Sequence, residues 1–293
     1  MTVPVGIVGL GEAGAAIAAG LAEQGTAVTA YDLRLTGPDG PGLRDFAGQA
    51  GIGLAADLAE LAGRAEILLS LVTGSAAVPV ARALAPHVRA GQVVADLNST
   101  SPGLARQVAE VIAPTGADFA DVAIMAAVPP HRHRVPMLAC GPGAGRLAEA
   151  GLGLRIEVID GEPGAASAVK MLRSLLVKGL ESLLVEFAVA ADRYGATERV
   201  LRSMTGSLPT EDWQELTTYL LSRTAKHGQR RGDELAEVAE MFRELDLSPG
   251  LAEAGAARLR WAAQRLGSRF ASQAPAHYQE VIDALARPEP EGE

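Results

Sequence analysis

Three glycines near the N-terminus have the spacing of a phosphate-binding turn. The 293-residue sequence starts with an apolar run, Val3–Val8, and continues directly as Gly9-Leu10-Gly11-Glu12-Ala13-Gly14 into a stretch of small residues. In this context Gly9 permits a tight turn, Gly11 lets backbone amides approach a pyrophosphate, and Gly14 lets a helix pack closely on the strand. The N-terminus of that helix favours an anion. Residues 9–14 are therefore predicted to bind a dinucleotide.

A carboxylate after the next apolar run bears on the choice of dinucleotide. Asp32 directly follows the run Ala27–Tyr31, where it can accept hydrogen bonds from the adenosine ribose and repel a 2′-phosphate. Arg34 would instead pair with a 2′-phosphate if it turned inward, or it is simply a solvated loop residue. We expect Tyr31, Asp32 and Arg34 to line the site and favour NAD as the cofactor, with NADP left open.

Lys170 is the candidate for proton transfer. On a helix, this lysine shares a polar stripe about 80° wide with Ser174, Lys178 and Glu181. The opposite side carries four leucines: Leu172, Leu175, Leu176 and Leu183. The stripe is either the wet face of an amphipathic helix or the wall of a cleft. In a cleft, desolvation and the charge of Lys178 would lower the pKa of Lys170 and let it exchange a proton near neutral pH.

The elements that must position these residues alternate along the first 160 residues. Short apolar runs are separated by helical stretches, a pattern typical of βαβ units in a parallel sheet. The predicted strands are Val3–Val8, Ala27–Tyr31, Ile67–Val72, Val93–Asp96, Phe119–Ile124, Val135–Cys140 and Ile156–Ile159. The predicted helices are Ala15–Gln24, Ala56–Leu61, Ala76–Ala83 and Leu104–Ile112, and Thr36–Gly42 is expected to be a flexible loop.

Beyond Gly164 the strand signal stops. Long helical stretches follow to about Ala286, with breaks expected at Gly195, Leu208-Pro209, Gly228 and Pro249-Gly250. The fold class is therefore predicted as α/β, with a Rossmann-type doubly wound parallel sheet followed by an all-α C-terminal domain. The expected domains are residues 1–160 and 161–286, with an acidic tail over 287–293.

Composition excludes several classes of partner. The net charge is −9, from 26 basic and 35 acidic residues, and no Lys/Arg tract is present, so neither nucleic acid nor an anionic membrane surface is expected as a partner. No apolar run has the roughly 20 residues of a spanning helix. The single cysteine, Cys140, cannot form an intramolecular disulfide. A cytoplasmic protein that acts on a small molecule is the expectation.

Five landmarks together resemble the β-hydroxyacid dehydrogenase family, relatives of 6-phosphogluconate and 3-hydroxyisobutyrate dehydrogenases. They are the glycine turn, Asp32, the segments 96–102 and 121–127, and the run Gly164-Ala-Ala-Ser-Ala-Val-Lys170. The stretch after Lys170 is similar to a little-characterised branch with its own helical C-terminal domain. The resemblance implies NAD(P)-dependent hydride transfer with a small hydroxy acid or related polar alcohol. It also implies a homodimer built on the helix near 165–193.

The resemblance assigns further residues by position. Lys170 falls on the catalytic lysine of the family, Ser174 replaces its substrate-binding asparagine, and Asn98 lies in its strand-end motif beside the nicotinamide. Val72 and Thr73 are expected at the cofactor, and Ser99 and Lys178 at the substrate. Met125-Ala126-Ala127 stands where most members carry Ser-Gly-Gly for the substrate carboxylate. This departure puts a simple 3-hydroxy acid substrate in doubt.

Two basic clusters and two other functions remain as alternatives. The first cluster is His131-Arg132-His133-Arg134, which either compensates for the missing Ser-Gly-Gly or forms an exposed turn. No metal site is expected at this cluster, because no nearby Cys or carboxylate completes one. A second basic cluster either meets an anionic substrate or pairs with Asp233 and Glu234; it comprises Arg223, Lys226, His227, Arg230 and Arg231. The alternative functions are an imine reductase, which Lys170 argues against, and a dinucleotide-binding sensor without turnover.

Overall fold

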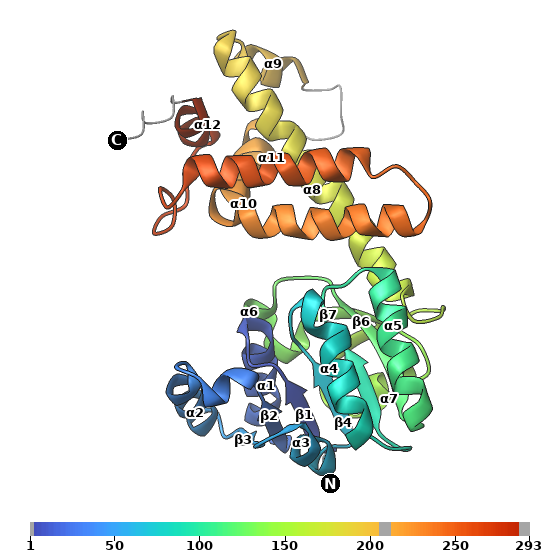
Figure 1. Ribbon diagram of the computed structural model, residues 1–293. Helices are drawn as coiled ribbons and strands as arrows, with labels where there is room; N and C mark the ends of the chain where they lie inside the picture. The colour runs from blue at the N-terminus through green and yellow to red at the C-terminus, as the bar shows by residue number, and fades with distance from the viewer. Residues whose placement is uncertain (1–2, 205–211, 287–293) are drawn as a thin grey trace. The chain divides into compact units, whose positions relative to one another are not determined.

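The protein has two compact units, Met1–Lys170 and Met171–Glu293, in a computed structural model that describes residues 3–204 and 212–286 (Figure 1). The boundary between the units falls inside the long helix α8 (Ala165–Arg193), whereas the sequence placed it before that helix, at residue 160. The predicted architecture, a Rossmann-type sheet followed by an all-α region, is confirmed.

The first unit is built on an eight-stranded sheet of order β3-β2-β1-β4-β5-β6-β7-β8. The strands are β1 (Val5–Val8), β2 (Val28–Tyr31), β3 (Gly53–Leu54), β4 (Ile67–Ser70), β5 (Val93–Asp96), β6 (Asp118–Ile124), β7 (Pro136–Cys140) and β8 (Arg155–Val158). Neighbouring strands are parallel except β6 and β7. The order reverses between β1 and β4, which is where this class of sheet binds a dinucleotide, at the carboxyl ends of its strands.

Helices cover both faces of the sheet because its strands are apolar on both sides. Ile7 of β1 packs with one set of helices: α1 (Glu12–Glu23), α2 (Gly40–Gln49), α6 (Val128–His131) and α7 (Ala144–Glu149). Val8 packs with the other set: α3 (Leu58–Arg64), α4 (Ala77–Leu84) and α5 (Pro102–Ile112). Figure 1 shows α4 and α5 side by side on their face.

Two of the differences from the prediction for this unit concern the segment Thr36–Gly42 and the direction of β7. Thr36–Gly42, expected to be a flexible loop, instead ends a 3-10 turn (Leu33–Thr36) and begins α2. Pro41 is tolerated there because the first turn of a helix has no partner for its missing amide. β7 runs antiparallel to β6, not parallel. The linking residues 125–135 form only one-turn helices, too little for the crossover that a parallel strand needs.

The second unit is helical throughout its described part. It contains the rest of α8 together with α9 (Thr197–Met204), α10 (Trp213–Glu244), α11 (Gly250–Leu266) and α12 (Tyr278–Ala286). The break expected at Gly228 is a kink within α10, where His227 has φ −134°. Gly228 lies against α11, so closely that a β-carbon would be 3.0 Å from the Leu259 carbonyl oxygen. The predicted Leu208-Pro209 turn and the 287–293 tail lie outside the described residues.

Among the described helices, none combines the length and the apolar character that a membrane crossing requires.

Candidate active site

The glycine turn has the geometry that its sequence predicts. Gly9 has φ +97°, and a β-carbon on it would lie 2.5 Å from the Leu71 carbonyl oxygen. A β-carbon on Gly14 would lie 2.0 Å from the carbonyl oxygen of Gly9. Gly11, by contrast, faces open space, and no side chain caps the N-terminus of α1 that it begins. An open approach to the free amides of a helix N-terminus fits a pyrophosphate.

Asp32 ties this turn to the end of β2. Its Oδ2 accepts a hydrogen bond from the Leu10 amide at 2.7 Å, and its Oδ1 accepts one from the Arg34 amide at 2.9 Å. The Arg34 guanidinium also donates to both oxygens. Burial opposes ionisation of Asp32, but the hydrogen bonds from Arg34 and Leu10 hold its pKa below the usual range. Asp32 is thus a carboxylate at neutral pH, and Arg34 turns toward it.

Asn98 links the ends of β4 and β5 through side-chain hydrogen bonds. Its Oδ1 accepts a hydrogen bond from the Val72 amide at 2.6 Å, and its Nδ2 donates to the Ser70 hydroxyl at 3.1 Å. The side chain is buried, while Ser99 beside it is exposed. The hydroxyl of Thr73 lies 3.3 Å from that of Ser75. Asn98 therefore fixes the backbone of Val72 at these strand ends, and contact of either residue with a cofactor stays a prediction.

A second carboxylate anchors the start of α8. Asp121, on β6, accepts hydrogen bonds from the amides of Gly164 and Ser167, at 2.9 and 3.2 Å, and from the Ser167 hydroxyl at 2.8 Å. The Cys140 thiol lies 3.4 Å from the same carboxylate. The first turn of the long helix is thereby fixed to the middle of β6. Sequence reasoning used Asp121 only as a landmark and missed Ser167; a small polar residue one turn before a candidate lysine was the available signal.

Lys170 follows one turn after Ser167. Residues three apart lie on the same side of a helix, so Lys170 shares the side of α8 that Asp121 binds. The lysine is half-buried, and its charge favours the ionised form of Asp96 at the end of β5. The structure thus brings Lys170 together with the end of β5 and the middle of β6 in the same unit as the glycine turn.

Comparisons with known proteins agree with this geometry. Residues 4–141 match the family described as the NAD binding domain of 6-phosphogluconate dehydrogenase, and residues 191–262 match a domain of unknown function, DUF1932. A conserved hypothetical protein from Sinorhizobium meliloti 1021 is 36% identical, with a TM-score of 0.83 over 98% of this chain and 96% of that one. A second conserved protein of unknown function, described as structurally similar to 3-hydroxyacid dehydrogenases, is 30% identical, with a TM-score of 0.74 over 88% and 96% of the two chains. The chain belongs to the β-hydroxyacid dehydrogenase family.

Solved structures of lower identity share the fold. The 3-hydroxyisobutyrate dehydrogenase of Mycobacterium tuberculosis, solved with L-serine, is 17% identical, with a TM-score of 0.72 over 98% of this chain and all of that one. The N-terminal unit contains a nicotinamide-dinucleotide-binding domain of the 6-phosphogluconate dehydrogenase type. Within the family, this chain belongs to the branch with the DUF1932 C-terminal domain.

The segment that departs from the family pattern lies beyond β6. Met125 is half-buried and its amide is bonded to the Pro136 carbonyl, while Ala126 and Ala127 are exposed. In the basic cluster that follows, His133 is buried against Gly20 of α1, and Arg132 pairs with Glu23 at the end of that helix. His131 and Arg134 of the cluster are exposed, and compensation for the missing Ser-Gly-Gly by this cluster stays a prediction.

Two other predicted site residues lie in the second unit. Lys178 is buried, and its ammonium pairs with Glu234 at 2.7 Å and donates to the Ser174 hydroxyl at 3.1 Å. Burial lowers the pKa of Lys178. Contact of Ser174 and Lys178 with a substrate stays a prediction.

The basic cluster on α10 is largely paired. Arg231 is buried in an ion pair with Glu181 of α8. Arg230 pairs with Glu234 at 2.7 Å, as the alternative interpretation of this cluster anticipated. Within the described residues, no group of three or more His, Cys, Asp or Glu side chains is arranged to hold a metal ion.

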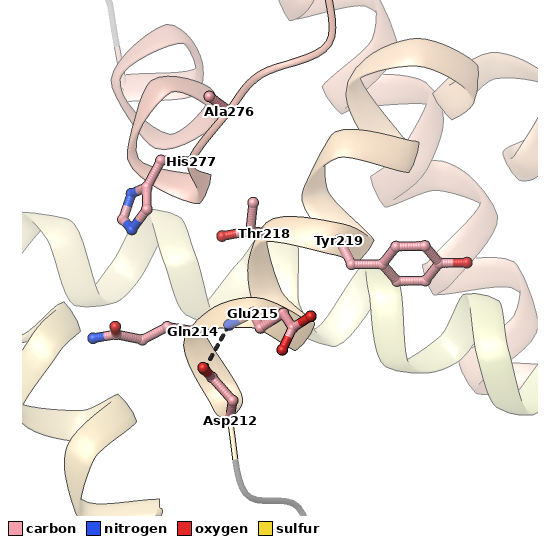
Figure 2. A pocket seen from close by; sticks show the side chains of 7 residues that line it. All are labelled: Asp212, Gln214, Glu215, Thr218, Tyr219, Ala276 and His277. Carbon is pink, nitrogen blue, oxygen red and sulfur yellow. Dashed lines mark hydrogen bonds between the residues drawn. The ribbon is translucent and has the colours of Figure 1, made fainter.

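A hollow of about 370 Å³ also lies in the second unit, between the start of α10 and the residues before α12 (Figure 2). Asp212 and Glu215 line it together with Tyr219 and His277, and the Asp212 carboxylate accepts a hydrogen bond from the Glu215 amide at 2.7 Å. None of the site residues predicted from the sequence lines this hollow.

Proposed function

We propose that the protein transfers a hydride between a nicotinamide dinucleotide and a small hydroxy acid or related polar alcohol, with Lys170 as the general acid and base. The observation that carries this proposal is the anchoring of α8 by Asp121, one turn before Lys170. The glycine turn and Asp32 would hold the pyrophosphate and the adenosine at β1 and β2, and residues at the ends of β4 and β5 would hold the nicotinamide half. Lys170 lies on that side of the unit.

Lys170 moves the proton and the bound nicotinamide accepts or supplies the hydride. In the oxidative direction, neutral Lys170 takes the hydroxyl proton while the hydride leaves the carbon that bears this hydroxyl, and a carbonyl group forms. In the reductive direction, the Lys170 ammonium gives its proton to the oxygen of the forming alkoxide. Asn98 acts indirectly, because it fixes the Val72 backbone at the strand ends.

The cofactor is proposed to be NAD rather than NADP. Asp32 is an ionised carboxylate at the end of β2, the position from which such a group binds the ribose hydroxyls and repels a 2′-phosphate. Arg34 offsets part of this charge, because its guanidinium lies against both carboxylate oxygens. The NAD preference is therefore expected to be moderate.

We further propose that the protein forms a homodimer, because α8 exposes apolar side chains and buries charged ones. Two polar residues of α8, Lys178 and Glu181, are buried, whereas three of its leucines are exposed. Leu172, Leu176 and Leu183 recur at intervals of four and seven residues and are 52%, 75% and 59% exposed. The δ-carbon of Leu251, itself exposed at the start of α11, extends this apolar surface at Gly179. A second copy that packs its own α8 against this surface would bury it.

The test of the activity combines cofactor binding with turnover. NADH and NADPH are titrated by fluorescence, and the better cofactor is then used with hydroxy acids, aldehydes and imines. Lys170→Ala is expected to lose about 10²- to 10⁴-fold in turnover of hydroxy acids and to keep its cofactor affinity. Turnover of imines alone would favour an imine reductase. Cofactor binding with no turnover on the whole panel would favour a dinucleotide-binding sensor.

A further inference from the structure

Two buried carboxyl groups lie next to each other, one at the end of β5 and one in the middle of β6. Asp96 and Asp121 are direct neighbours in the register of these parallel strands, and each is 2% exposed. Adjacent strands are about 4.8 Å apart, so the two groups interact at short range in a region that excludes water. Ionisation of both would place two negative charges side by side in the interior, which is costly unless donors surround each of them.

The surroundings of the two groups differ. Donors from Gly164, Ser167 and Cys140 converge on Asp121, a set that suits an ionised carboxylate because such a group only accepts hydrogen bonds. Asp96 accepts one backbone hydrogen bond on Oδ1, from the Asn98 amide at 3.0 Å. Its Oδ2 is buried and has no hydrogen-bond partner among the residues that the structure describes. The fold therefore surrounds Asp121 with more hydrogen-bond donors than Asp96.

The charged and titratable groups around Asp96 come from four elements. Asp121 lies beside it on β6, Cys140 contacts Asp121 from β7, Lys170 acts on it from α8, and Arg106 of α5 lies near the start of α8. Burial raises the pKa of Asp96 to about 7; the Asn98 amide opposes this shift, the charge of Asp121 adds to it, and Lys170 opposes it. Asp96 thus exchanges its proton near neutral pH.

We propose that Asp96 holds a proton beside the Asp121 carboxylate and thereby sets how readily Lys170 gives up its own proton. Asp96 is a positioning residue in this scheme, since it acts through Lys170 and touches neither substrate nor cofactor. While Asp96 is neutral, it adds no negative charge beside Lys170. When Asp96 releases its proton to water, a second negative charge favours the ammonium form of Lys170. The consequence for catalysis rests on the proposed role of Lys170; the shared proton itself does not.

The protonation of Asp96 is tested without any substrate. Aspartate labelled with ¹³C at Cγ is followed by NMR as a function of pH, and the Asp96 signal is assigned by its loss in Asp96→Asn. We expect a midpoint near pH 7 in the unaltered protein. Lys170→Met removes a cation and should move the midpoint to higher pH. Asp118→Asn, an exposed position on the same strand, should leave it unchanged. A midpoint in the ordinary aspartate range, or one indifferent to Lys170→Met, would overturn the proposal.

The effect on Lys170 is read from the pH dependence of kcat/KM for alcohol oxidation. Asp96→Asn keeps the neighbour neutral at every pH, so the rise in rate as Lys170 loses its proton should occur at lower pH than in the unaltered enzyme. NADH affinity should not change. A profile that keeps its position while the rate falls would indicate a merely structural residue and would overturn the coupling. If Lys170→Ala leaves turnover intact, the proposed function fails, and the NMR titration still decides the location of the proton.

Discussion

The guanidinium of Arg34 lies flat against the Asp32 carboxylate, with Nε 3.0 Å from Oδ1 and Nη2 2.8 Å from Oδ2. Arg34→Ala would leave the Asp32 charge uncompensated at the position where a 2′-phosphate would lie. Because a hydrogen bond to a charged group contributes about 1.5–3 kcal/mol, we expect NADPH to bind about tenfold more weakly and NADH to change little. Fluorescence titration of both cofactors measures the two affinities.

The matched variant for this experiment is Asp32→Asn, which keeps the shape and removes the charge. It should weaken NADH binding and reduce the discrimination against NADPH. If the unaltered protein binds NADPH at least about tenfold tighter than NADH, the interpretation of Asp32 is wrong and Arg34 carries the preference.

Two glycines of the same turn should respond differently to one methyl group. Gly14→Ala would put a β-carbon 2.0 Å from the Gly9 carbonyl oxygen, so the turn must move and we expect a loss of about 1–3 kcal/mol in stability. Gly11→Ala meets no protein atom within 4 Å and should leave the melting temperature unchanged. Its methyl group would occupy the approach of the pyrophosphate, so NADH affinity should fall. Thermal unfolding and NADH titration of both variants separate the two effects; unchanged NADH affinity in Gly11→Ala would contradict the proposed cofactor position.

The glycine turn and Asp32 were predictable because their chemistry is local. The motif and the next strand end are close in sequence, and the strand–turn–helix context gives each glycine a separate steric reason. The Asp96 and Asp121 pair was not predictable in this way, since it depends on the register of two strands 25 residues apart. Periodicity within each strand carries no information on that register.

The long helix α8 shows a second limit of prediction from the sequence. Its period correctly separates the polar stripe from the leucines, yet the structure buries Lys178 and Glu181 of the stripe and exposes Leu172, Leu176 and Leu183. Periodicity identifies two faces and does not say which one is inside. The inward face of α8 is decided by partners such as Glu234, which lies 56 residues beyond Lys178 in the sequence and pairs with it. Short-range patterns do not include that pairing.

Asp96 should make the protein more stable at acid pH. Its folded-state pKa is raised from 3.8 to about 7, so the folded protein binds the proton more tightly than the unfolded chain. Between these values stability from this group falls as pH rises. Asp96→Asn removes the effect, which is on the order of 4 kcal/mol at most for about three pKa units. Melting temperatures should therefore rise in the variant at pH 8 and not at pH 4; an equal change at both would contradict the assignment.

His133, unlike Asp96, should make the protein less stable at acid pH. The ring is packed near Gly20, and neither nitrogen has a hydrogen-bond partner in the part of the chain that the structure describes. Burial, with the charges of Arg134 and Arg132, lowers the pKa of His133 below 6.5. The unfolded chain then binds the proton more readily, so stability present above pH 6.5 is lost as pH falls. His133→Leu should lose less stability between pH 7 and pH 5 than the unaltered protein does.

The control for that experiment is His131→Leu, at an exposed position two residues earlier. Its unfolding should follow the unaltered protein at both pH values. If the two variants behave alike, burial of His133 does not cause the acid sensitivity.

If the exposed leucines of α8 form the dimer interface, a charge placed among them should dissociate the dimer. Leu176 is 75% exposed in the single chain, and burial of a leucine contributes about 1.5–3 kcal/mol. Leu176→Glu would place two charges in the proposed interface of a symmetric dimer and should give a monomer at micromolar concentration, measured by light scattering after size exclusion. Leu33→Glu is the matched control, because Leu33 is 78% exposed in the first unit and lies outside α8. A monomeric unaltered protein, or a Leu176→Glu variant that remains dimeric, would show that the exposed leucines of α8 have another role.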